Sequence, residues 1–371
     1  MGSKRALVTG GAGFIGSHLV DLLVERGYEV TILDNLESQT HLRGKPQWVN
    51  PNARFIEGDV RDETSVEKAL QGVHWLFHLA AFGGFTQEIS KYIDVNVRGT
   101  GRIFEKIGTG KFSIEKVMVA SSQAIYGEGA YRCRQDGFQF PPSRSIGALQ
   151  KKQWEPLCPR CGCSLEPVLV SEEKPCDSQT AYALSKEFEE RLALLHGRHF
   201  NLPVVALRFG VTYGPRQSLF NPYTGVVSIF STRLLNDQPP QVYEDGRQKR
   251  DFVYVGDVAR ATLFVMEKEA ADFQAFNVGT GQATTVAELA RHLATIYQKS
   301  LEPRIPGEFR VGDVRHILLD PTKLSRLGFH ATTSLEKGLS FFAEWMKSQS
   351  RVEEYFTQAY GTLKKLRIVR S

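Results

Sequence analysis

Three scarcities in this 371-residue chain each argue against a class of protein. Only five residues are cysteine, and all of them lie between Cys133 and Cys176, which argues against an exported protein held together by disulfides. No stretch approaches about 18 uninterrupted apolar residues, so a membrane-spanning helix is excluded. Basic residues outnumber acidic residues by only five, 46 against 41, which gives little support for nucleic acid or a membrane surface as a partner.

The remaining composition is that of a globular protein. Hydrophobic residues make up 42% of the chain and charged residues 23%, close to the globular average. The length fits one large α/β domain or a large domain with a smaller partner. A β pattern begins almost at the first residue and leaves no room for a signal peptide, so we expect a cytoplasmic protein.

Short apolar β runs alternate with amphipathic helical patterns in the first third of the chain. The expected strands cover residues 6–9, 29–33, 54–57, 75–80 and 117–120. The expected helices cover residues 14–26, 62–71 and 88–107. Repeated strand–helix–strand order with nearly continuous apolar strands predicts a doubly wound parallel sheet of the Rossmann type, covered by helices on both faces.

The pattern breaks down between about residues 128 and 177 and then resumes. We expect a first domain over residues 1–208, with 128–177 as a cysteine-rich insert, and a smaller α/β domain mainly over 209–371. The chain is expected to return to the first domain around 241–282, with strands near 241–243 and 252–255. The basic end of the chain is expected to be solvated; it carries Lys364, Lys365, Arg367 and Arg370.

A glycine-rich turn joins the first expected strand to the first expected helix. Gly10, Gly13 and Gly16 permit close approach of a diphosphate, and the helix N-terminus supplies N–H donors and a partial positive charge. Asp34 lies 18 residues after Gly16, where a carboxylate accepts from both adenosine ribose hydroxyls. The same carboxylate repels a 2′-phosphate, so the pattern predicts NAD rather than NADP.

Tyr182 and Lys186 stand one turn apart in a strongly helical segment, on one helix face. A phenol with an ordinary pKa of about 10 is a poor base at neutral pH. A nearby ammonium and the positive nicotinamide ring of NAD⁺ favour the phenolate and lower that pKa. Ser122 ends the fifth expected strand, where a hydroxyl faces the ligand crevice of an open α/β sheet. Tyr-x-x-x-Lys alone is common by chance, and its position after that strand makes it a candidate catalytic pair.

Five motifs in this order resemble the extended short-chain dehydrogenases/reductases, and more narrowly the NAD-dependent epimerase/dehydratase family. They cover residues 9–16, 78–81, 121–127, 182–186 and 213–216. The resemblance implies that Ser122, Tyr182 and Lys186 are catalytic. It also implies a homodimer formed through the helices expected at 88–107 and 178–199. The full set expected to bind NAD is Gly10, Gly13, Phe14, Ile15, Gly16, Asp34, Asn35, Asp59, Val60, Leu79, Ala80, Ala81, Asn96, Tyr182 and Lys186.

The residues after Ser122 bear on the reaction. The dehydratases of this family carry Asp-Glu directly after the hydroxyl, whereas this chain has Gln123 and Ala124, which cannot do acid–base work. The resemblance therefore implies 4-epimerisation of a nucleotide sugar through transient oxidation at C4. A nucleotide-sugar oxidoreductase or decarboxylase, and a non-catalytic NAD sensor of the same fold, are the alternatives.

The resemblance also assigns residues to the nucleotide of the substrate. Arg250 would meet the diphosphate, Arg310 a phosphate and Asp313 the ribose, with arginine the expected residue for forked contact with phosphate. The full set expected to bind substrate is Ser122, Gln123, Tyr182, Asn221, Gln248, Arg250, Arg310 and Asp313. Val211 departs from the family, which usually has asparagine there.

Segments 221–226, 246–252 and 312–316 most resemble the dTDP-L-rhamnose 4-epimerase subgroup, which makes dTDP-6-deoxy-L-talose. The long gap between Tyr126 and Tyr182 is a further feature of that subgroup. The substrate implied is dTDP-L-rhamnose. UDP-hexose and UDP-uronate 4-epimerases are the alternatives.

The cysteine-rich insert contains the run Cys158-Pro-Arg-Cys161-Gly-Cys163, which has the shape of a zinc knuckle. Two thiolates two residues apart can hold one tetrahedral ion, and glycine eases the turn. We expect four of five cysteines to bind a structural zinc, namely four among Cys133, Cys158, Cys161, Cys163 and Cys176. The alternative is five reduced thiols in a loop. The insert is expected to fold over the sugar pocket as a flap.

Overall fold

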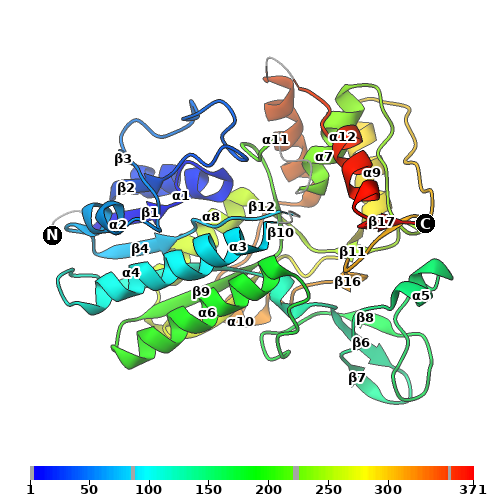
Figure 1. The fold of residues 1–371 in the computed structure, drawn as a ribbon, viewed down its shortest axis with the longest axis horizontal. Helices are drawn as coiled ribbons and strands as arrows, with labels where there is room; N and C mark the ends of the chain where they lie inside the picture. The colour runs from blue at the N-terminus through cyan, green and yellow to red at the C-terminus, as the bar shows by residue number, and fades with distance from the viewer. Residues whose placement is uncertain (1–3, 85–87, 220–224, 350–351) are drawn as a thin grey trace.

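The computed structural model describes residues 4–84, 88–219, 225–349 and 352–371. Its main sheet has seven parallel strands in the order β13-β9-β5-β4-β1-β2-β3 (Figure 1). The strands are β1 (Arg5–Thr9), β2 (Glu29–Asp34), β3 (Arg54–Glu57), β4 (Trp75–His78), β5 (Lys116–Ser122), β9 (Val204–Phe209) and β13 (Gln274–Val278). The predicted Rossmann-type parallel sheet is confirmed.

Helices cover both faces of the sheet, which is why its strands are almost continuously apolar. On one face α1 (Phe14–Glu25), α8 (Val255–Met266) and α10 (Thr322–Arg326) contribute Leu19, Leu23, Val258 and Leu324 to one core cluster. On the other face α2 (Glu63–Leu70), α4 (Gly99–Gly108) and α6 (Ala181–His199) contribute Val66, Ile103 and Ala193 to a second. In the described part of the chain, no helix has the length and apolarity needed to cross a membrane.

The long helix expected at 88–107 contains a change of pitch. It runs as α3 (Ile89–Tyr92), a π-helical segment η1 (Ile93–Arg98) and then α4 without a break. Single π turns inside α-helices often occur at functional sites. Here the π segment contains Asn96, which is fully buried.

A second group of helices lies beyond the carboxyl ends of the strands. Its core contains Phe230, Leu289, Leu293 and Phe342. The helices are α7 (Val226–Leu235), α9 (Val286–Ile296) and α11 (Leu335–Lys347). Short strands connect this group to the sheet domain: β10 (Val211–Tyr213) pairs with β12 (Phe252–Tyr254), and β11 (Lys249–Arg250) pairs with β14 (Thr284–Thr285) and β16 (His316–Ile317).

The return of the chain to the main sheet is shorter than expected. Helix α8, the short η3 (Glu269–Ala271) and β13 belong to the sheet layer, whereas β11 does not. The strand expected at 241–243 is absent from the described residues, and Gln241 forms only an isolated bridge with Arg304.

The basic end of the chain is folded onto the protein, and its basic side chains stay exposed at Lys364, Lys365 and Arg367 and half-buried at Arg370. Helix α12 (Phe356–Lys365) buries Phe356, Ala359 and Leu363, and the Lys364 Nζ lies 2.6 Å from a carboxylate oxygen of Glu308. Strand β17 (Val369–Arg370) then pairs antiparallel with β15 (Phe309–Arg310). Charge alone did not indicate this packing, because the apolar residues are interleaved with the basic ones.

The cysteine-rich insert has a small fold of its own. Strands β6 (Ala130–Cys133), β7 (Gly137–Gln139) and β8 (Glu166–Val168) form an antiparallel sheet in the order β7-β6-β8. The short helix α5 (Ile146–Gln150) lies between β7 and β8 in the chain. It lies at the edge of the molecule near β16, away from the main sheet (Figure 1). Glu128, at its start, accepts hydrogen bonds from the backbone N–H groups of Arg315 and His316.

Candidate active site

The glycine turn after β1 packs the start of α1 tightly against the backbone. A Cβ on Gly16 would lie 2.1 Å from the Gly10 carbonyl oxygen, and Gly10 itself has a φ of 71°. Asp34, at the end of β2, braces the turn because its carboxylate accepts from the Ala12 N–H at 3.0 Å. These contacts leave the exposed backbone of the turn open to a phosphate.

A cavity of about 290 Å³ opens beside this turn, at the carboxyl ends of the strands. Every residue predicted to bind NAD lines it except Asn96. Residues that sequence reasoning did not assign also line it, and these are Leu33, Glu37, Gln39, Thr40, His41, Gly58, Phe82, Gly83, Val95, Ala120, Ser121 and Phe209. The Ser121 Oγ is buried at this wall and has no hydrogen-bond partner among the described residues.

Asp59 is held as a carboxylate at the rim of this cavity. Burial alone would raise its pKa, but hydrogen bonds from Arg61 and Asn35 lower the pKa of Asp59 to about 2. Asn35 donates to its Oδ2 at 2.8 Å, and the Arg61 guanidinium is ion-paired at 2.8 Å. The two predicted cofactor residues Asn35 and Asp59 therefore lie together.

Asn96 lies behind the wall of the cavity instead of in it. Its Oδ1 accepts from the Phe82 N–H at 2.7 Å, and its Nδ2 donates to the Ser185 Oγ at 2.9 Å. The side chain thus ties the segment after β4 to α6. Asn96 positions the cavity wall in this structure and makes no direct contribution to the lining.

Helix α6 carries Tyr182 and Lys186 on its first turns, and both side chains line the cavity. Thr180 caps the helix, since its Oγ1 accepts from the Ala183 N–H at 3.1 Å. Lys186 is only 2% exposed. Its Nζ donates to the Glu189 Oε2 at 2.6 Å, so the ammonium is paired inside the protein.

Glu189 was missed by sequence reasoning, although it follows Lys186 by three residues on the same helix. Burial raises the pKa of Glu189 to about 7, opposed by the ammonium of Lys186. The Glu189 Oε1 lies 3.8 Å from the Nε2 of buried His78. A carboxyl group with a pKa near neutrality therefore sits directly behind the candidate catalytic lysine.

His78 is held neutral between two threonines. The Thr100 Oγ1 donates to the Asn96 carbonyl, so it accepts from His78 Nε2 at 2.9 Å. The other nitrogen, Nδ1, accepts from the Thr9 Oγ1 at 2.7 Å. Burial, with a smaller contribution from Lys186, lowers the pKa of His78 to about 3.

A second cavity, of about 470 Å³, meets the first at Tyr182 and Gly83, which line both. Ser122 and Gln123 line the second cavity next to Tyr182. The Ser122 Oγ accepts from the Ala124 N–H at 3.1 Å, which leaves the hydroxyl proton available to a ligand. The Gln123 Oε1 is buried without a hydrogen-bond partner among the described residues.

Two guanidinium groups and one carboxylate gather in the wall of the second cavity. The Asp313 carboxylate lies 3.5 Å from Arg250 and 3.0 Å from Arg310, measured between the nearest nitrogen and oxygen atoms. Burial alone would raise the pKa of Asp313, but Arg310 and Arg250 hold it below its ordinary value. Arg250 also donates to the Val314 carbonyl at 2.7 Å. This is the predicted set of nucleotide-binding residues.

The structure does not bring every predicted substrate residue to this cavity. Gln248 is buried elsewhere and donates to the Tyr243 carbonyl at 2.8 Å, and Asn221 lies outside the described residues. Val211 lines the cavity, as do Gln179, Thr180 and Gly312, which sequence reasoning did not assign.

Among the described lining residues none comes from the insert at 128–177, so the expectation of a flap over the pocket was wrong.

The cysteines divide into two groups. Cys133, Cys158 and Cys161 lie together with Asp136, and the four potential ligand atoms are within 4.8 Å of one another. Cys163 is exposed and Cys176 is half-buried, and neither belongs to this group. The structure therefore brings together three of the five predicted thiols, with a carboxylate instead of a fourth thiol. Asp136 was missed because the sequence does not show that it ends a tight turn after Cys133.

Comparisons with known proteins find relatives along most of the chain. A family model described as the NAD dependent epimerase/dehydratase family matches residues 6–152 and 165–279. A dTDP-L-rhamnose 4-epimerase from Burkholderia thailandensis is 33% identical over 353 residues, which cover 93% of this chain and 96% of that protein.

Solved structures of 4-epimerases share the whole fold. A UDP-glucose 4-epimerase from Thermotoga maritima, solved with UDP-glucose, superposes with a TM-score of 0.74 at 33% identity and covers 92% of this chain and 98% of its own. A UDP-glucose 4-epimerase from Thermus thermophilus, solved with NAD, also superposes with a TM-score of 0.74, at 30% identity. The match covers 93% of this chain and 99% of that chain.

Proposed function

The chain is an enzyme of the NAD-dependent epimerase/dehydratase family, and from that premise we propose that it epimerises dTDP-L-rhamnose at C4 with bound NAD. The observation that carries the proposal is the position of Tyr182 in the wall shared by the two cavities. A group placed there can act on a ligand in one cavity while a cofactor occupies the other. Lys186 lines the first cavity beside Tyr182, and Ser122 lines the second.

The first cavity fits a dinucleotide. The glycine turn offers close backbone approach, Asp34 suits the ribose hydroxyls, and the unpartnered Ser121 hydroxyl is available to a polar ligand group. The chemistry that NAD supplies when bound there is reversible acceptance of a hydride from a sugar carbon. In this proposal residues 1–208 form the NAD-binding domain and 209–371 mainly bind the substrate.

The chain's own residues move and hold the proton. Tyr182 as a phenolate takes the proton of the C4 hydroxyl, and it gives a proton back when the keto group is reduced. Lys186 lies one turn along α6, and its positive charge favours the phenolate. Ser122 donates a hydrogen bond to the sugar oxygen at C4 and keeps its own proton. The sugar then turns in the second cavity between the two hydride transfers, while Arg250 and Arg310 hold the diphosphate.

The lining of the second cavity favours epimerisation over dehydration. Among its described lining residues, Asp313 is the only carboxylate, and it is engaged by Arg250 and Arg310. Gln123 and Ala124, which line the cavity beside Ser122, cannot exchange protons with a sugar carbon. Nothing in this described lining supplies the acid–base pair that loss of water requires.

The same lining favours a 6-deoxy sugar over a uronate. Ala124, Val211 and Ile317 present apolar groups, which suit the methyl group of a 6-deoxyhexose. A uronate carboxylate needs a cation, and the described lining residues offer Arg250 and Arg310, both of which are assigned to the diphosphate. The cavity lining therefore favours dTDP-L-rhamnose over UDP-glucuronate.

The test uses purified protein without added NAD. Proton NMR follows separate incubations with dTDP-L-rhamnose, UDP-glucose and UDP-glucuronate. We expect a mixture of C4 epimers from dTDP-L-rhamnose with no accumulation of NADH. Conversion of a UDP-hexose alone would overturn the substrate assignment, and stoichiometric NADH from every sugar would overturn epimerisation.

We also propose that the enzyme is a homodimer, joined through α3, η1 and α6. Ile89, Ile93, Leu184 and Phe188 are between 47% and 62% exposed on these adjacent helices. Exposed apolar side chains gathered on adjacent helices are typical of an interface. Light scattering should show that Phe188→Asp is monomeric and that Leu42→Asp, which changes an exposed leucine elsewhere, is dimeric. A monomeric native protein would contradict the proposal.

A further inference from the structure

The insert contains a cluster of side chains that the proposed reaction does not use. We infer that Cys133, Asp136, Cys158 and Cys161 bind one structural zinc ion, which anchors the insert against the nucleotide end of the second cavity. The metal site itself does not rest on the proposed function. Only its effect on substrate affinity does.

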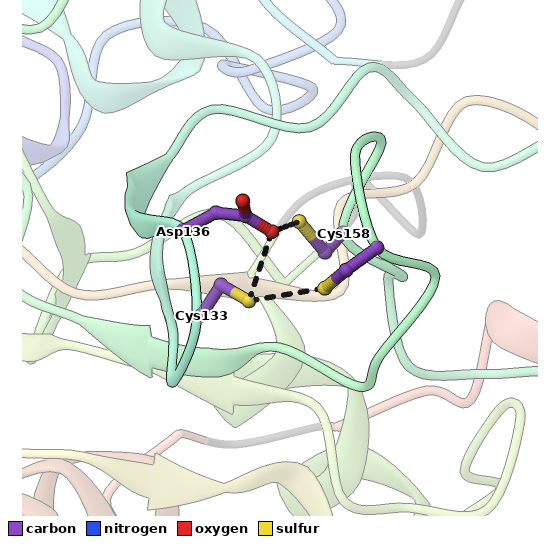
Figure 2. Close-up of side chains that lie close together, drawn as sticks. Cys133, Asp136 and Cys158 are labelled. Carbon is purple, nitrogen blue, oxygen red and sulfur yellow. Dashed lines mark hydrogen bonds between the residues drawn. The ribbon is translucent and has the colours of Figure 1, made fainter.

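The four donor atoms lie close enough together to surround one ion, all within 4.8 Å of one another. The Cys133 Sγ lies 3.4 Å from the Cys161 Sγ and 3.5 Å from the Asp136 Oδ2, and the Cys158 Sγ lies 3.2 Å from the same oxygen. Zinc bonds of about 2.3 Å to sulfur and about 2.0 Å to oxygen require edges of about 3.8 Å between sulfurs and about 3.5 Å between sulfur and oxygen. These three distances reach the required edges with shifts of a few tenths of an ångström, and the other three pairs of donor atoms lie within 4.8 Å of each other. Figure 2 shows the labelled side chains turned toward a common point.

Two tight turns bring the donors together. Cys133 ends β6 and Asp136 lies in the turn that leads to β7, where Cys133 pairs with Gly137. In the second turn the Gly162 N–H donates to the Cys158 carbonyl at 2.9 Å, and Gly162 has a φ of 73°. A residue with a side chain is strained at that φ, so the glycine after Cys161 serves the turn geometry of a knuckle.

The insert has too little apolar core to hold these turns by packing. Its own buried cluster consists of Tyr131, Cys133, Cys158 and Leu165, and two of those four are members of the proposed site. Small modules with cores of this size are usually stabilised by disulfides or a metal. The free Cys133 and Cys161 sulfurs are 3.4 Å apart, well beyond the roughly 2.05 Å of a disulfide bond.

The donor set selects the metal and its role. Thiolates favour zinc, copper(I) and iron–sulfur clusters over the hard cations, and a tetrahedral site with one carboxylate suits zinc. All four positions are filled by side chains, and such closed sites are structural.

The chain between the two turns carries the contacts to the nucleotide end of the second cavity. Arg144 donates to both carboxylate oxygens of Glu244, at 2.8 and 2.9 Å, and to the Asp313 carbonyl at 2.9 Å. Glu155 accepts from the guanidinium of fully buried Arg315. Since the proposed ligands flank residues 137–157, the metal fixes both ends of the segment that holds Asp313 in place.

The first experiment measures metal in the full-length protein purified without chelator. Elemental analysis should find about one zinc per chain. Cys158→Ser should lower this below about one-tenth, because binding depends on the complete ligand set. The matched control is Cys163→Ser, which changes a thiol of the same turn outside the cluster and should keep the zinc. Asp136→Ala should lose zinc, and Asp136→Cys should restore it.

A second measurement remains decisive if the variants fail to fold. The native protein is stripped with chelator and titrated with Co²⁺, and visible d–d bands with a thiolate charge-transfer band should saturate at one ion per chain. Absence of zinc together with absence of these bands would overturn the site, whether or not the enzyme is an epimerase. A Cys133–Cys161 disulfide found by mass spectrometry, or equal zinc loss in Cys163→Ser, would also overturn it.

The last readout is the Michaelis constant for the nucleotide sugar. Stripped enzyme should show a KM raised by more than kcat is lowered, and added Zn²⁺ should restore it. An unchanged KM in metal-free, folded enzyme would overturn the anchoring role and leave the site itself supported by the cobalt spectrum.

Discussion

Removing one buried guanidinium should weaken the attachment of the insert to the rest of the protein. All five N–H donors of Arg315 are used, by two hydrogen bonds to Glu155, one to Glu244 and two to Asp245, at 2.5–3.1 Å. Arg315 is fully buried, and the Glu244 side chain is 1% exposed. The substitution Arg315→Met keeps most of the volume and leaves these carboxylates without that partner.

The expected cost follows from the burial of this network. Breaking a buried ion pair costs about 3–5 kcal/mol, and the partial exposure of Glu155 and Asp245 keeps the total within that range although three carboxylates are involved. At about 2.1 cal/mol/K of unfolding entropy per residue, this lowers the melting temperature of a chain of this length by about 4–6 °C.

Differential scanning calorimetry compares Arg315→Met with Arg134→Met. Arg134 pairs with Glu166 at 3.0 Å in the same insert, but its side chain is 88% exposed. Such a pair contributes about 0–1 kcal/mol, so the control should melt within about 1 °C of the native protein. Equal shifts in the two variants would refute the reasoning. The KM for the nucleotide sugar should rise only in Arg315→Met, because the Arg315 and Val314 carbonyls hold Arg250.

Three further predictions concern the first cavity and its surroundings. Tyr182→Phe should keep bound NAD and lose at least about 100-fold in turnover, because proton transfer is removed, and near-normal activity would exclude Tyr182 as the base. Gly16→Ala should abolish NAD retention, measured by absorbance after denaturation, because its Cβ would lie 2.1 Å from the Gly10 carbonyl oxygen; Gly101→Ala, with open space around it, should retain NAD. Burial lowers the pKa of His78 from an ordinary 6.5 to about 3, so its contribution to stability is complete above pH 6.5 and is lost as the pH falls toward 3. The melting temperature of His78→Gln should therefore fall less between pH 6.5 and 4 than that of the native protein. An equal fall in both proteins would contradict the lowered pKa of His78.

Local patterns predicted most of the sheet because its strands are apolar on both faces. Strand β3 (Arg54–Glu57) covers the same residues as the strand expected from the sequence. The glycine turn precedes α1 as expected. Tyr182 and Lys186 could be predicted as neighbours because helix geometry alone places them one turn apart. The family expected from five motifs is confirmed by the comparisons.

Contacts between distant segments could not be predicted in this way. Asn96 reaches Phe82 and Ser185 from a π turn that has no sequence signature. Cys176 lies outside the thiol cluster and Asp136 within it, because the turn after β6 determines which side chains converge. Strand β17 pairs with β15 about sixty residues earlier, a pairing that the basic composition of the chain end concealed.

The proposed reaction depends on oxidation and reduction at one sugar carbon while the cofactor stays bound. The most direct measurement uses dTDP-L-rhamnose carrying deuterium at C4, incubated with the enzyme in ordinary water without added NAD. We predict that the C4 epimer retains the deuterium at C4, as read by NMR and mass spectrometry. An epimer that carries solvent hydrogen at C4, or deuterium recovered in released NADH, would contradict the account.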